Sequence, residues 1–123
     1  MVIRTNYSNP PTHGAKVVAA VLNNPELYAM WVEELAEMRI RIKQMRSALA
    51  EKLRAAGVQQ DVSFIEQQRG MFSYSGLSRE QVSRLAEEFA IYAVGSGRIC
   101  VAALNNSNID TVANAMARVM LEA

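Results

Sequence analysis

The chain has 123 residues, of which 50% are hydrophobic and 20% are charged, and its net charge at pH 7 is +1. This balance is typical of a soluble globular unit and gives no reason to expect a nucleic acid or an anionic membrane as a partner. A single cysteine, Cys100, excludes an internal disulfide and, with one histidine, excludes a zinc site of the usual ligand count. No apolar run approaches the roughly 20 residues of a membrane span, and the first residues lack a signal-peptide pattern. We therefore expect a cytoplasmic protein.

Residues 1–24 combine an irregular segment with a short helix. The adjacent prolines Pro10 and Pro11 are incompatible with regular helix or a central strand. From His13 to Leu22, small and apolar residues recur at helical spacing. This pattern predicts a short helix that ends at Asn23 and Asn24.

The segment from Pro25 to Ala56 is predicted to be one uninterrupted helix. Asn24 suits the N-cap, Pro25 the first helical position, and Gly57 a left-handed stop. The apolar residues recur at steps of three and four, the spacing of one helix face: Leu27, Trp31, Leu35, Met38, Ile42, Met45, Leu49 and Leu53. At about 1.5 Å per residue the helix is about 48 Å long, which exceeds the width of a small domain. We expect it to connect two packing environments.

The charged residues of this helix are interpreted as its solvated face. Lys43, Arg46 and Arg54 alternate with Glu37 and Glu51. Mixed charge of this kind is typical of a helix surface in contact with water. We therefore expect Arg46 to lie in solvent.

Four short strands are predicted after the long helix. Val58–Ile65 and Met71–Tyr74 are separated by a polar segment that includes Gly70, and we expect them to pair as a hairpin. Ile91–Val94 and Arg98–Val101 flank a Gly-Ser-Gly turn and are expected to form two more strands.

Capping patterns mark two further helices. Ser78 and Gln81 have the spacing of a capping box, which predicts a helix that carries Val82, Leu85, Ala86 and Phe89. Asn106–Asn108 is expected to cap a final helix whose inner face carries Ile109, Val112, Ala113, Met116, Val119 and Met120. The elements together predict an α/β layer in which helices cover a small sheet.

Arg98 is the most informative single residue for chemistry, because it follows Gly97 at the start of a strand in an apolar stretch. Two interpretations are open. Charged residues are seldom buried without a partner, and this favours an arginine that binds carbonyls or a carboxylate within the protein. Alternatively, its planar donors form a bidentate site for an anionic ligand, with Gly95 and Gly97 allowing close approach.

The other polar candidates are weaker. Arg4 presents the same choice as Arg98, but an arginine near a chain end is usually solvated. Residues of the type and position of Ser8 and Asn9 most often bond to the local backbone. Phe72 lies two residues after Gly70, and it is either a core residue after a bend or part of the wall of a pocket. His13 has no cysteine, serine or carboxylate motif beside it. The sequence contains no recognisable nucleophile–base pair, metal cluster or acid pair.

Three segments together resemble a known family. They are RTNYSNPPTHG at Arg4–Gly14, GMFSYSG at Gly70–Gly76 and SGRICV at Ser96–Val101, with the long helix between the first two. In this order and spacing they resemble the C-terminal third of the class I aspartate and aromatic amino acid aminotransferases. The sequence looks closer to the bacterial aromatic, or tyrosine, branch.

The resemblance implies a pyridoxal phosphate enzyme of fold type I that transfers an amino group between an amino acid and a 2-oxo acid. It also implies a homodimer with a large cofactor domain and a small domain that closes over the substrate. By this resemblance, residues 1–24 belong to the edge of the large domain, 25–56 form the connecting helix, and 57–123 form the small α/β domain.

The resemblance also implies roles for individual residues. Arg98 matches the arginine that binds the substrate α-carboxylate, and Arg4 matches the arginine that reaches across the dimer to a distal carboxylate. Phe72 matches an aromatic residue of the substrate pocket. Ser8 and Asn9 fall in the loop at the shared active site.

The cofactor-binding residues of the family find no match in this chain. The Schiff-base lysine, the aspartate at the pyridine nitrogen and the phosphate ligands are missing, and Lys16, Lys43 and Lys52 match none of them. We therefore expect the chain alone to bind no pyridoxal phosphate and to be inactive. The alternative is a non-catalytic structural module that self-associates through its apolar helix faces.

Overall fold

The computed structural model describes residues 11–122, which divide after Met38 into two units. The described part of the first unit holds α2 (Thr12–Asn23) and the beginning of α3 (Pro25–Ala55). The second unit holds the rest of α3 and all later elements. Each unit is described by itself. Among the described residues no helix has the length and apolar character that a membrane crossing requires.

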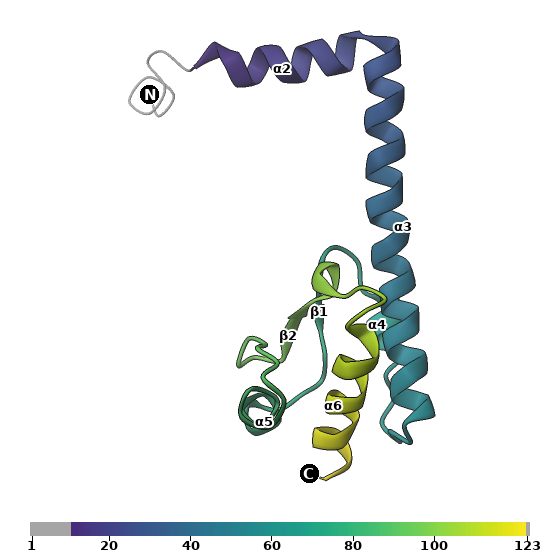
Figure 1. Ribbon diagram of the computed structural model, residues 1–123, viewed down its shortest axis with the longest axis vertical. Helices are drawn as coiled ribbons and strands as arrows, with labels where there is room; N and C mark the ends of the chain where they lie inside the picture. The colour runs from purple at the N-terminus through teal and green to yellow at the C-terminus, as the bar shows by residue number, and fades with distance from the viewer. Residues whose placement is uncertain (1–10, 123) are drawn as a thin grey trace. The chain divides into compact units, whose positions relative to one another are not determined.

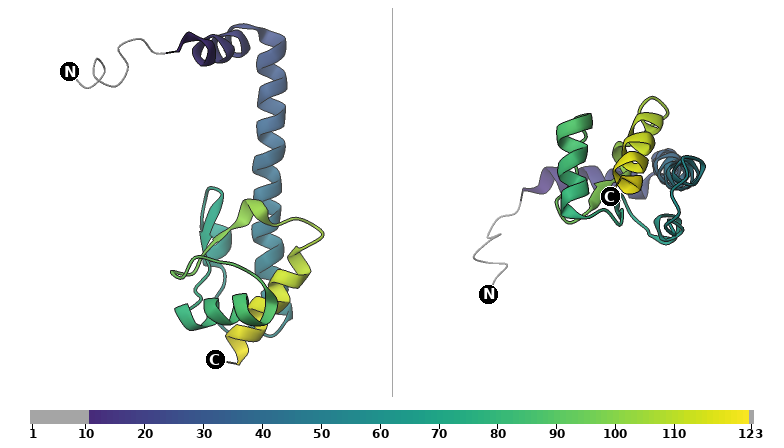
Figure 2. Two further views of the ribbon diagram at one scale, coloured as in Figure 1. Left: turned by 60° about the vertical axis from the view of Figure 1, so that its left-hand side comes forward. Right: turned by 90° about the horizontal axis from the view of Figure 1, so that it is seen from below.

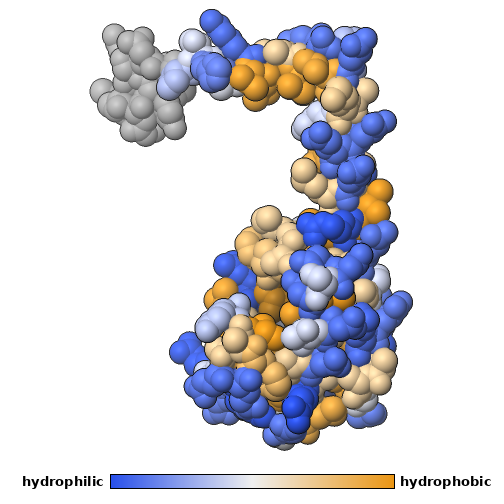
Figure 3. Space-filling model, in the orientation of Figure 1, coloured by the Kyte–Doolittle hydropathy of each residue, from blue (hydrophilic) through white to orange (hydrophobic). Residues whose placement is uncertain are grey.

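The first unit contains the predicted short helix and the predicted start of the long one. The Asn24 side chain accepts hydrogen bonds from the backbone N–H groups of Glu26 (3.0 Å) and Leu27 (3.1 Å), which confirms it as the N-cap of α3. No residue of α2 is buried. Apolar side chains gather on the surface of this unit, as Figure 3 shows along α2: Val17, Val18, Leu22, Leu27, Met30, Trp31 and Leu35 are all exposed.

The end of α3 follows the predicted stop signal to within one residue. Gly57 has a φ of 91°, and its N–H donates to the carbonyl of Arg54 (3.0 Å). The N–H of Val58 reaches back to the carbonyl of Leu53 (3.1 Å), which completes a Schellman motif. The second half of α3 is packed into the core through Met45, Arg46, Leu49, Ala50 and Leu53.

The predicted hairpin of Val58–Ile65 with Met71–Tyr74 is wrong. Residues 58–63 form no strand, and Phe64–Gln67 forms one helical turn, α4. The side chain of Asp61 accepts from the N–H of Ser63 (2.8 Å) and so starts this turn. Val62 and Ile65 are both buried, and their spacing of three belongs to one face of a helix rather than to a strand.

The sheet has two short antiparallel strands, β1 (Phe72–Tyr74) and β2 (Arg98–Cys100). Phe72 pairs with Cys100, and Tyr74 pairs with Arg98. The predicted strand Ile91–Val94 does not form, because only Val94 makes an isolated bridge, to Arg98. The N–H of Val94 donates to the carbonyl of Arg98, and the carbonyl of Val94 accepts from the N–H of Gly97, so these two bonds close the turn at residues 95–97. Residues 91–93 have no strand partner among the described residues.

The capping box of α5 (Arg79–Phe89) is confirmed. Ser78 accepts from the N–H of Gln81 (3.2 Å), and the Gln81 side chain accepts from the N–H of Ser78 (2.8 Å). The helix ends at Ala90, which adopts a left-handed conformation with a φ of 54°. This residue turns the chain away from the helix axis before the segment that returns to β2.

The last helix, α6 (Ile109–Leu121), follows the 3-10 turn η1 (Val101–Ala103). Its N-cap is Asn108, within the predicted range Asn106–Asn108. The side chain of Asn105 accepts from the N–H groups of Ser107 (2.9 Å) and Asn108 (3.2 Å) in the turn before the helix. The Asn108 side chain makes no capping bond to α6 and instead accepts from the N–H of Asn105 (2.8 Å). The predicted position of the cap is therefore confirmed, but its side chain makes no bond to the helix.

Within the second unit, α6 lies between α5 and the second half of α3 (Figures 1 and 2). The predicted inner face of α6 is confirmed, with Val112 partly buried and the others fully buried. The most deeply buried side chains come from all three helices and from the turn at α4: Leu49, Leu53, Ile65, Leu85, Met116 and Val119. This core supports one face of the small sheet.

Candidate functional site

Arg98 leaves the turn before β2 from a backbone that is fixed on both sides. Gly97 has a φ of 80°, and a Cβ at this position would lie 2.7 Å from the carbonyl oxygen of Leu77. The carbonyl of Gly97 accepts from the N–H (2.9 Å) and the hydroxyl (2.7 Å) of Ser75, which is 0% exposed. Only glycine fits this conformation and this space. The direction in which Arg98 projects is therefore set by the turn.

The guanidinium of Arg98 lies over an aromatic ring. Its Cζ is 4.8 Å from the centroid of Phe72, which sits diagonally across the strand pair from Arg98. A cation at this distance from a ring face is attracted by the ring quadrupole. Phe72 therefore holds the charge of Arg98 without using its hydrogen-bond donors.

No carboxylate within residues 11–122 forms an ion pair with Arg98, and no hydrogen bond from its guanidinium to a described residue is present. The ion pairs of this part of the chain use other basic residues, such as Arg54 with Glu66 (2.7 Å) and Arg84 with Glu88 (2.6 Å). The first interpretation of Arg98 requires a carbonyl or carboxylate partner within the protein, and residues 11–122 supply none to its guanidinium. The bidentate donors of Arg98 face an exposed surface.

Two surface hollows meet at the Phe72–Arg98 pair. One has a volume of about 400 Å³ and lies between β1, β2, α6 and residues 91–94, with Ile91, Val94, Ile99 and Val112 in its wall. The other, of about 340 Å³, is lined by the pair together with Ser73, Tyr74 and Ser96. Ligand pockets are typically about 300–1,000 Å³, mostly apolar, with a few placed polar groups. The chemistry of this region suits an anionic head group attached to an apolar body.

A buried arginine supports the strand that carries Phe72. Arg46 on α3 is 3% exposed, so the interpretation of this residue as part of a solvated face is wrong. Its Nη1 donates to the carbonyl of Ile65 (3.0 Å) and to Ser73 Oγ (2.9 Å), and its Nη2 donates to the carbonyls of Gly70 (2.7 Å) and Phe72 (2.8 Å). Desolvation lowers the pKa of this guanidinium.

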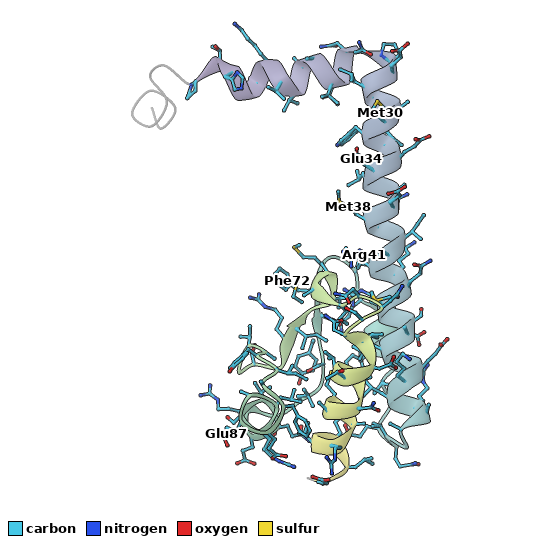
Figure 4. The ribbon with its side chains drawn as sticks, in the orientation of Figure 1. Met30, Glu34, Met38, Arg41, Phe72 and Glu87 are labelled. Atoms are coloured by element: carbon cyan, nitrogen blue, oxygen red, sulfur yellow. The ribbon has the colours of Figure 1, made fainter. Side chains whose placement is uncertain are left out.

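A second arginine of α3 binds the segment that follows β2. Arg41 donates from Nη1 to the carbonyl of Leu104 (2.8 Å) and from Nη2 to the carbonyl of Ala102 (3.1 Å). Figure 4 marks Arg41 on α3 and Phe72 on β1. Arg41 thus holds the segment that follows β2, and Arg46 holds the residues around β1.

The sequence did contain a signal for the burial of Arg46. It lies four residues after Ile42 and three before Leu49, on the apolar stripe of the helix. A charged residue at an inward position requires hydrogen-bond acceptors, and the carbonyls around Gly70 supply them. The alternation of charge along the helix concealed this position.

Comparison with known proteins decides the family. A family model described as "Aminotransferase class I and II" matches residues 1–116. The chain belongs to the class I and II aminotransferase family.

Relatives of this aminotransferase chain match it along nearly its whole length. It is 63% identical over 119 residues to the aspartate aminotransferase of Pseudomonas aeruginosa, a match that covers 97% of this chain and 30% of the relative. It is 52% identical over 118 residues to the aromatic-amino-acid aminotransferase of Escherichia coli K12, which covers 96% of this chain and 30% of that protein. The chain therefore spans about 30% of the length of the relatives that it matches.

A solved structure confirms the predicted fold. The aromatic-amino-acid aminotransferase from Burkholderia pseudomallei, described as covalently bound to pyridoxal phosphate, superposes with a TM-score of 0.94 and is 68% identical. The match covers 97% of this chain and 30% of that structure. The mitochondrial aspartate aminotransferase of Trypanosoma brucei superposes with a TM-score of 0.91 at 44% identity. The described residues thus form a segment of the fold type I aminotransferase fold.

The described residues of this aminotransferase chain do not by themselves fit pyridoxal phosphate. No lysine lines either hollow within the described range. Lys16 and Lys43 are exposed on helices, and Lys52 forms an ion pair with Asp110. Groups of three or more side chains that could hold a metal ion are likewise absent from residues 11–122.

Three of the predicted site residues, Arg4, Ser8 and Asn9, lie outside the described residues. Arg98 and Phe72 are the two that the structure describes, and it brings them together. His13, the one histidine, lies on the exposed surface of α2.

Proposed function

We propose that this chain is the part of an aspartate or aromatic amino acid aminotransferase that binds the substrate carboxylate. The reaction of the whole enzyme transfers an amino group between an amino acid and a 2-oxo acid. In this proposal residues 57–123 belong to the small domain, 25–56 to the connecting helix and 1–24 to the edge of the large domain. The cytoplasmic location expected from the sequence stays a prediction.

One observation supports this role more than any other. The guanidinium of Arg98 is stacked 4.8 Å from the Phe72 ring centroid and has no carboxylate partner among residues 11–122. A planar guanidinium with unused donors matches the two oxygens of a carboxylate. We assign the α-carboxylate of the substrate to Arg98, and the apolar wall beside Phe72 to its side chain.

Pyridoxal phosphate supplies the electron sink of the whole enzyme when it is bound. The residues that hold it are proposed to lie in the part of the enzyme that this chain does not contain. The three lysines of the chain lie outside the hollows at Arg98, and this supports the expectation that the chain alone is inactive.

Arg4 is proposed to bind the distal carboxylate of dicarboxylic substrates across a homodimer, with Ser8 and Asn9 in the adjoining loop. This proposal rests on the SNPP-containing motif and on the family to which the chain belongs. It gives the two arginines different duties. Arg98 serves every amino acid substrate, and Arg4 serves only those with a second carboxylate.

A second candidate function is a self-associating structural module. The exposed apolar side chains of α2 and the first part of α3 favour it, because exposed clusters of this kind usually mark an interaction surface. The first proposal explains the same surface through the missing part of the enzyme.

The test of the carboxylate proposal uses a chimera. This chain replaces the matching segment of the Pseudomonas aeruginosa aspartate aminotransferase, to which it is 63% identical. Arg98→Ala should lower kcat/KM for tyrosine and for aspartate alike by about 30-fold or more, the effect of removing about 2 kcal/mol or more from a charge-assisted pair. Arg98→Lys should restore only part of the loss, because lysine lacks the planar pair of donors.

Arg79→Ala provides the matched control, since Arg79 is an exposed arginine that lines neither hollow. This variant should behave like the unmodified chimera. Arg4→Ala should lower kcat/KM for aspartate and spare tyrosine. Unchanged kinetics in Arg98→Ala would contradict the role of Arg98, and equal losses for both substrates would contradict that of Arg4.

A further inference from the structure

The outer edge of β1 is closed by side chains in place of a third strand. Residues 71, 73 and 75 direct their backbone groups toward β2, as the bonds of Met71 and Ser75 show. The carbonyls of Gly70 and Phe72 and the N–H of Tyr74 therefore point the other way. Without partners these groups would be left for water or another chain.

Arg46 and Gln68 satisfy this edge. Nη2 of Arg46 donates to the carbonyls of Gly70 (2.7 Å) and Phe72 (2.8 Å). The side-chain oxygen of Gln68 accepts from the N–H of Tyr74 (2.7 Å) and from the hydroxyl of Ser73 (2.9 Å). That same hydroxyl accepts from Nη1 of Arg46 (2.9 Å), so the two side chains belong to one network. The network fixes β1 from the side opposite β2.

The burial of the Arg46 guanidinium carries a desolvation cost that packing alone would not require. It is 3% exposed, and no carboxylate of the described residues pairs with it. Its charge is balanced only by three carbonyls and one hydroxyl. A buried cation carries a large desolvation cost, and apolar replacements of buried charges are often neutral or stabilising. This cost is accounted for if the guanidinium determines a geometry that apolar packing would leave loose.

The geometry in question is that of the Phe72 ring. Arg46 holds the carbonyl of Phe72, and the ring of Phe72 lies under the guanidinium of Arg98. We propose that Arg46 is a positioning residue for substrate binding. It fixes β1, and the Phe72 ring then holds the Arg98 guanidinium in the orientation that binds the carboxylate. This inference rests on the proposed function of Arg98.

The kinetic test uses the chimera with tyrosine as substrate. Arg46→Met keeps a long apolar side chain and removes the donors, and it should raise KM about tenfold while kcat changes by less than about twofold. In a Phe72→Leu background the same substitution should raise KM by less than about twofold, because its effect passes through the ring. Arg46→Lys should recover part of the KM, since an ammonium still donates to the carbonyls.

Arg41→Met is the matched control. Arg41 lies on the same helix and also donates to two carbonyls, but these belong to Ala102 and Leu104 and not to β1. The KM of the Arg41→Met chimera should stay within about twofold of that of the unmodified chimera. Urea midpoints of all variants separate a general loss of stability from the specific effect.

A second measurement needs no enzyme activity. In NMR spectra of the 123-residue chain, the ring current of Phe72 should shift the side-chain resonances of Arg98 upfield. Arg46→Met should move these resonances toward their positions in Phe72→Leu, while core methyl resonances such as those of Leu49 and Leu85 keep their dispersion. Arg41→Met should leave the Arg98 resonances in place.

The outcomes separate the two proposals. If Arg98→Ala leaves KM unchanged, the proposed function fails, whatever Arg46 does. If Arg98→Ala raises KM but Arg46→Met raises it no more than Arg41→Met, the positioning role is overturned. Equal KM effects of Arg46→Met with and without Phe72 would overturn it as well. Arg98 resonances that do not move in Arg46→Met would also contradict it.

Discussion

Gly97 shows at the scale of one residue how the direction of Arg98 is set. Its φ of 80° is costly for a residue with a side chain, and a Cβ would also meet the Leu77 carbonyl at 2.7 Å. Gly97→Ala should therefore lower the free energy of unfolding by more than about 1–2 kcal/mol, the cost of the left-handed conformation alone. Urea unfolding of the 123-residue chain measures the loss.

Two other glycines of the chain separate strain from collision. Gly57 has a φ of 91°, but open space surrounds its Cβ position, whereas Gly95 has neither a positive φ nor a close neighbour. The losses should rank Gly97→Ala above Gly57→Ala, and Gly57→Ala above Gly95→Ala. A Gly97→Ala loss no larger than that of Gly57→Ala would mean that the contact with Leu77 relaxes without cost.

The two arginines of the site also show what a residue's type can and cannot predict. Arg98 was recognisable from its motif, because glycine on its N-terminal side and apolar neighbours made an arginine unexpected there. The environment of Arg46 was missed. Its acceptors come from Ile65, Gly70, Phe72 and Ser73, which lie far along the chain, and local charge alternation carries no information about such partners.

At the scale of elements, an ion-pair network joins the end of α5 to the end of α6. Arg84 binds Glu88 (2.6 Å) on its own helix and Glu122 (2.7 Å) beyond α6. The Arg84 guanidinium, chiefly through its hydrogen bond, holds the pKa of the Glu88 carboxyl below its ordinary value of 4.5. Folding therefore favours the ionised form of Glu88.

The lowered pKa of Glu88 predicts an acid-dependent loss of stability. The contribution of this carboxylate is complete above its unfolded pKa of about 4.5, and it disappears as the pH falls through the lower folded value. Glu88→Gln should be less stable than the unmodified chain at pH 7. Below the folded pKa of Glu88, the two chains should have similar free energies of unfolding. Urea midpoints between pH 7 and pH 3 test this, with exposed Glu80→Gln as the control; parallel curves for Glu88→Gln and the unmodified chain would contradict the prediction.

The helices with capping signals and the two strands that form were predictable to within a residue or so, but the pairing of the strands was not. The caps at Asn24, Ser78 and Gly57 act within a few residues, so their side chains are read directly from the sequence. The strands have three residues each and pair across more than twenty residues of chain. Residues 58–65 and 91–94 contain β-formers but lack a partner edge among the described residues, and pairing rather than propensity decides a strand.

At the scale of the whole molecule, the long helix passes from the first unit into the second, and its apolar residues have opposite environments in the two. Leu49 and Leu53 are buried in the second unit, whereas Trp31 and Leu35 of the first unit remain 43% and 44% exposed. The helical spacing is the same throughout. A periodic stripe therefore predicts an apolar face but does not say which protein segment covers it.

We expect this exposed face to drive self-association of the 123-residue chain. Burial of one leucine side chain contributes about 1.5–3 kcal/mol, so Leu35→Glu should weaken the association at least about tenfold. Gln44→Glu adds the same charge at an exposed position of α3 and should leave the association unchanged. Sedimentation at micromolar concentration measures the size, and Trp31, the one tryptophan, should report burial by a blue shift of its fluorescence. A monomer under these conditions, with no concentration-dependent shift, would show that the apolar residues of α2 and α3 do not bind a second copy.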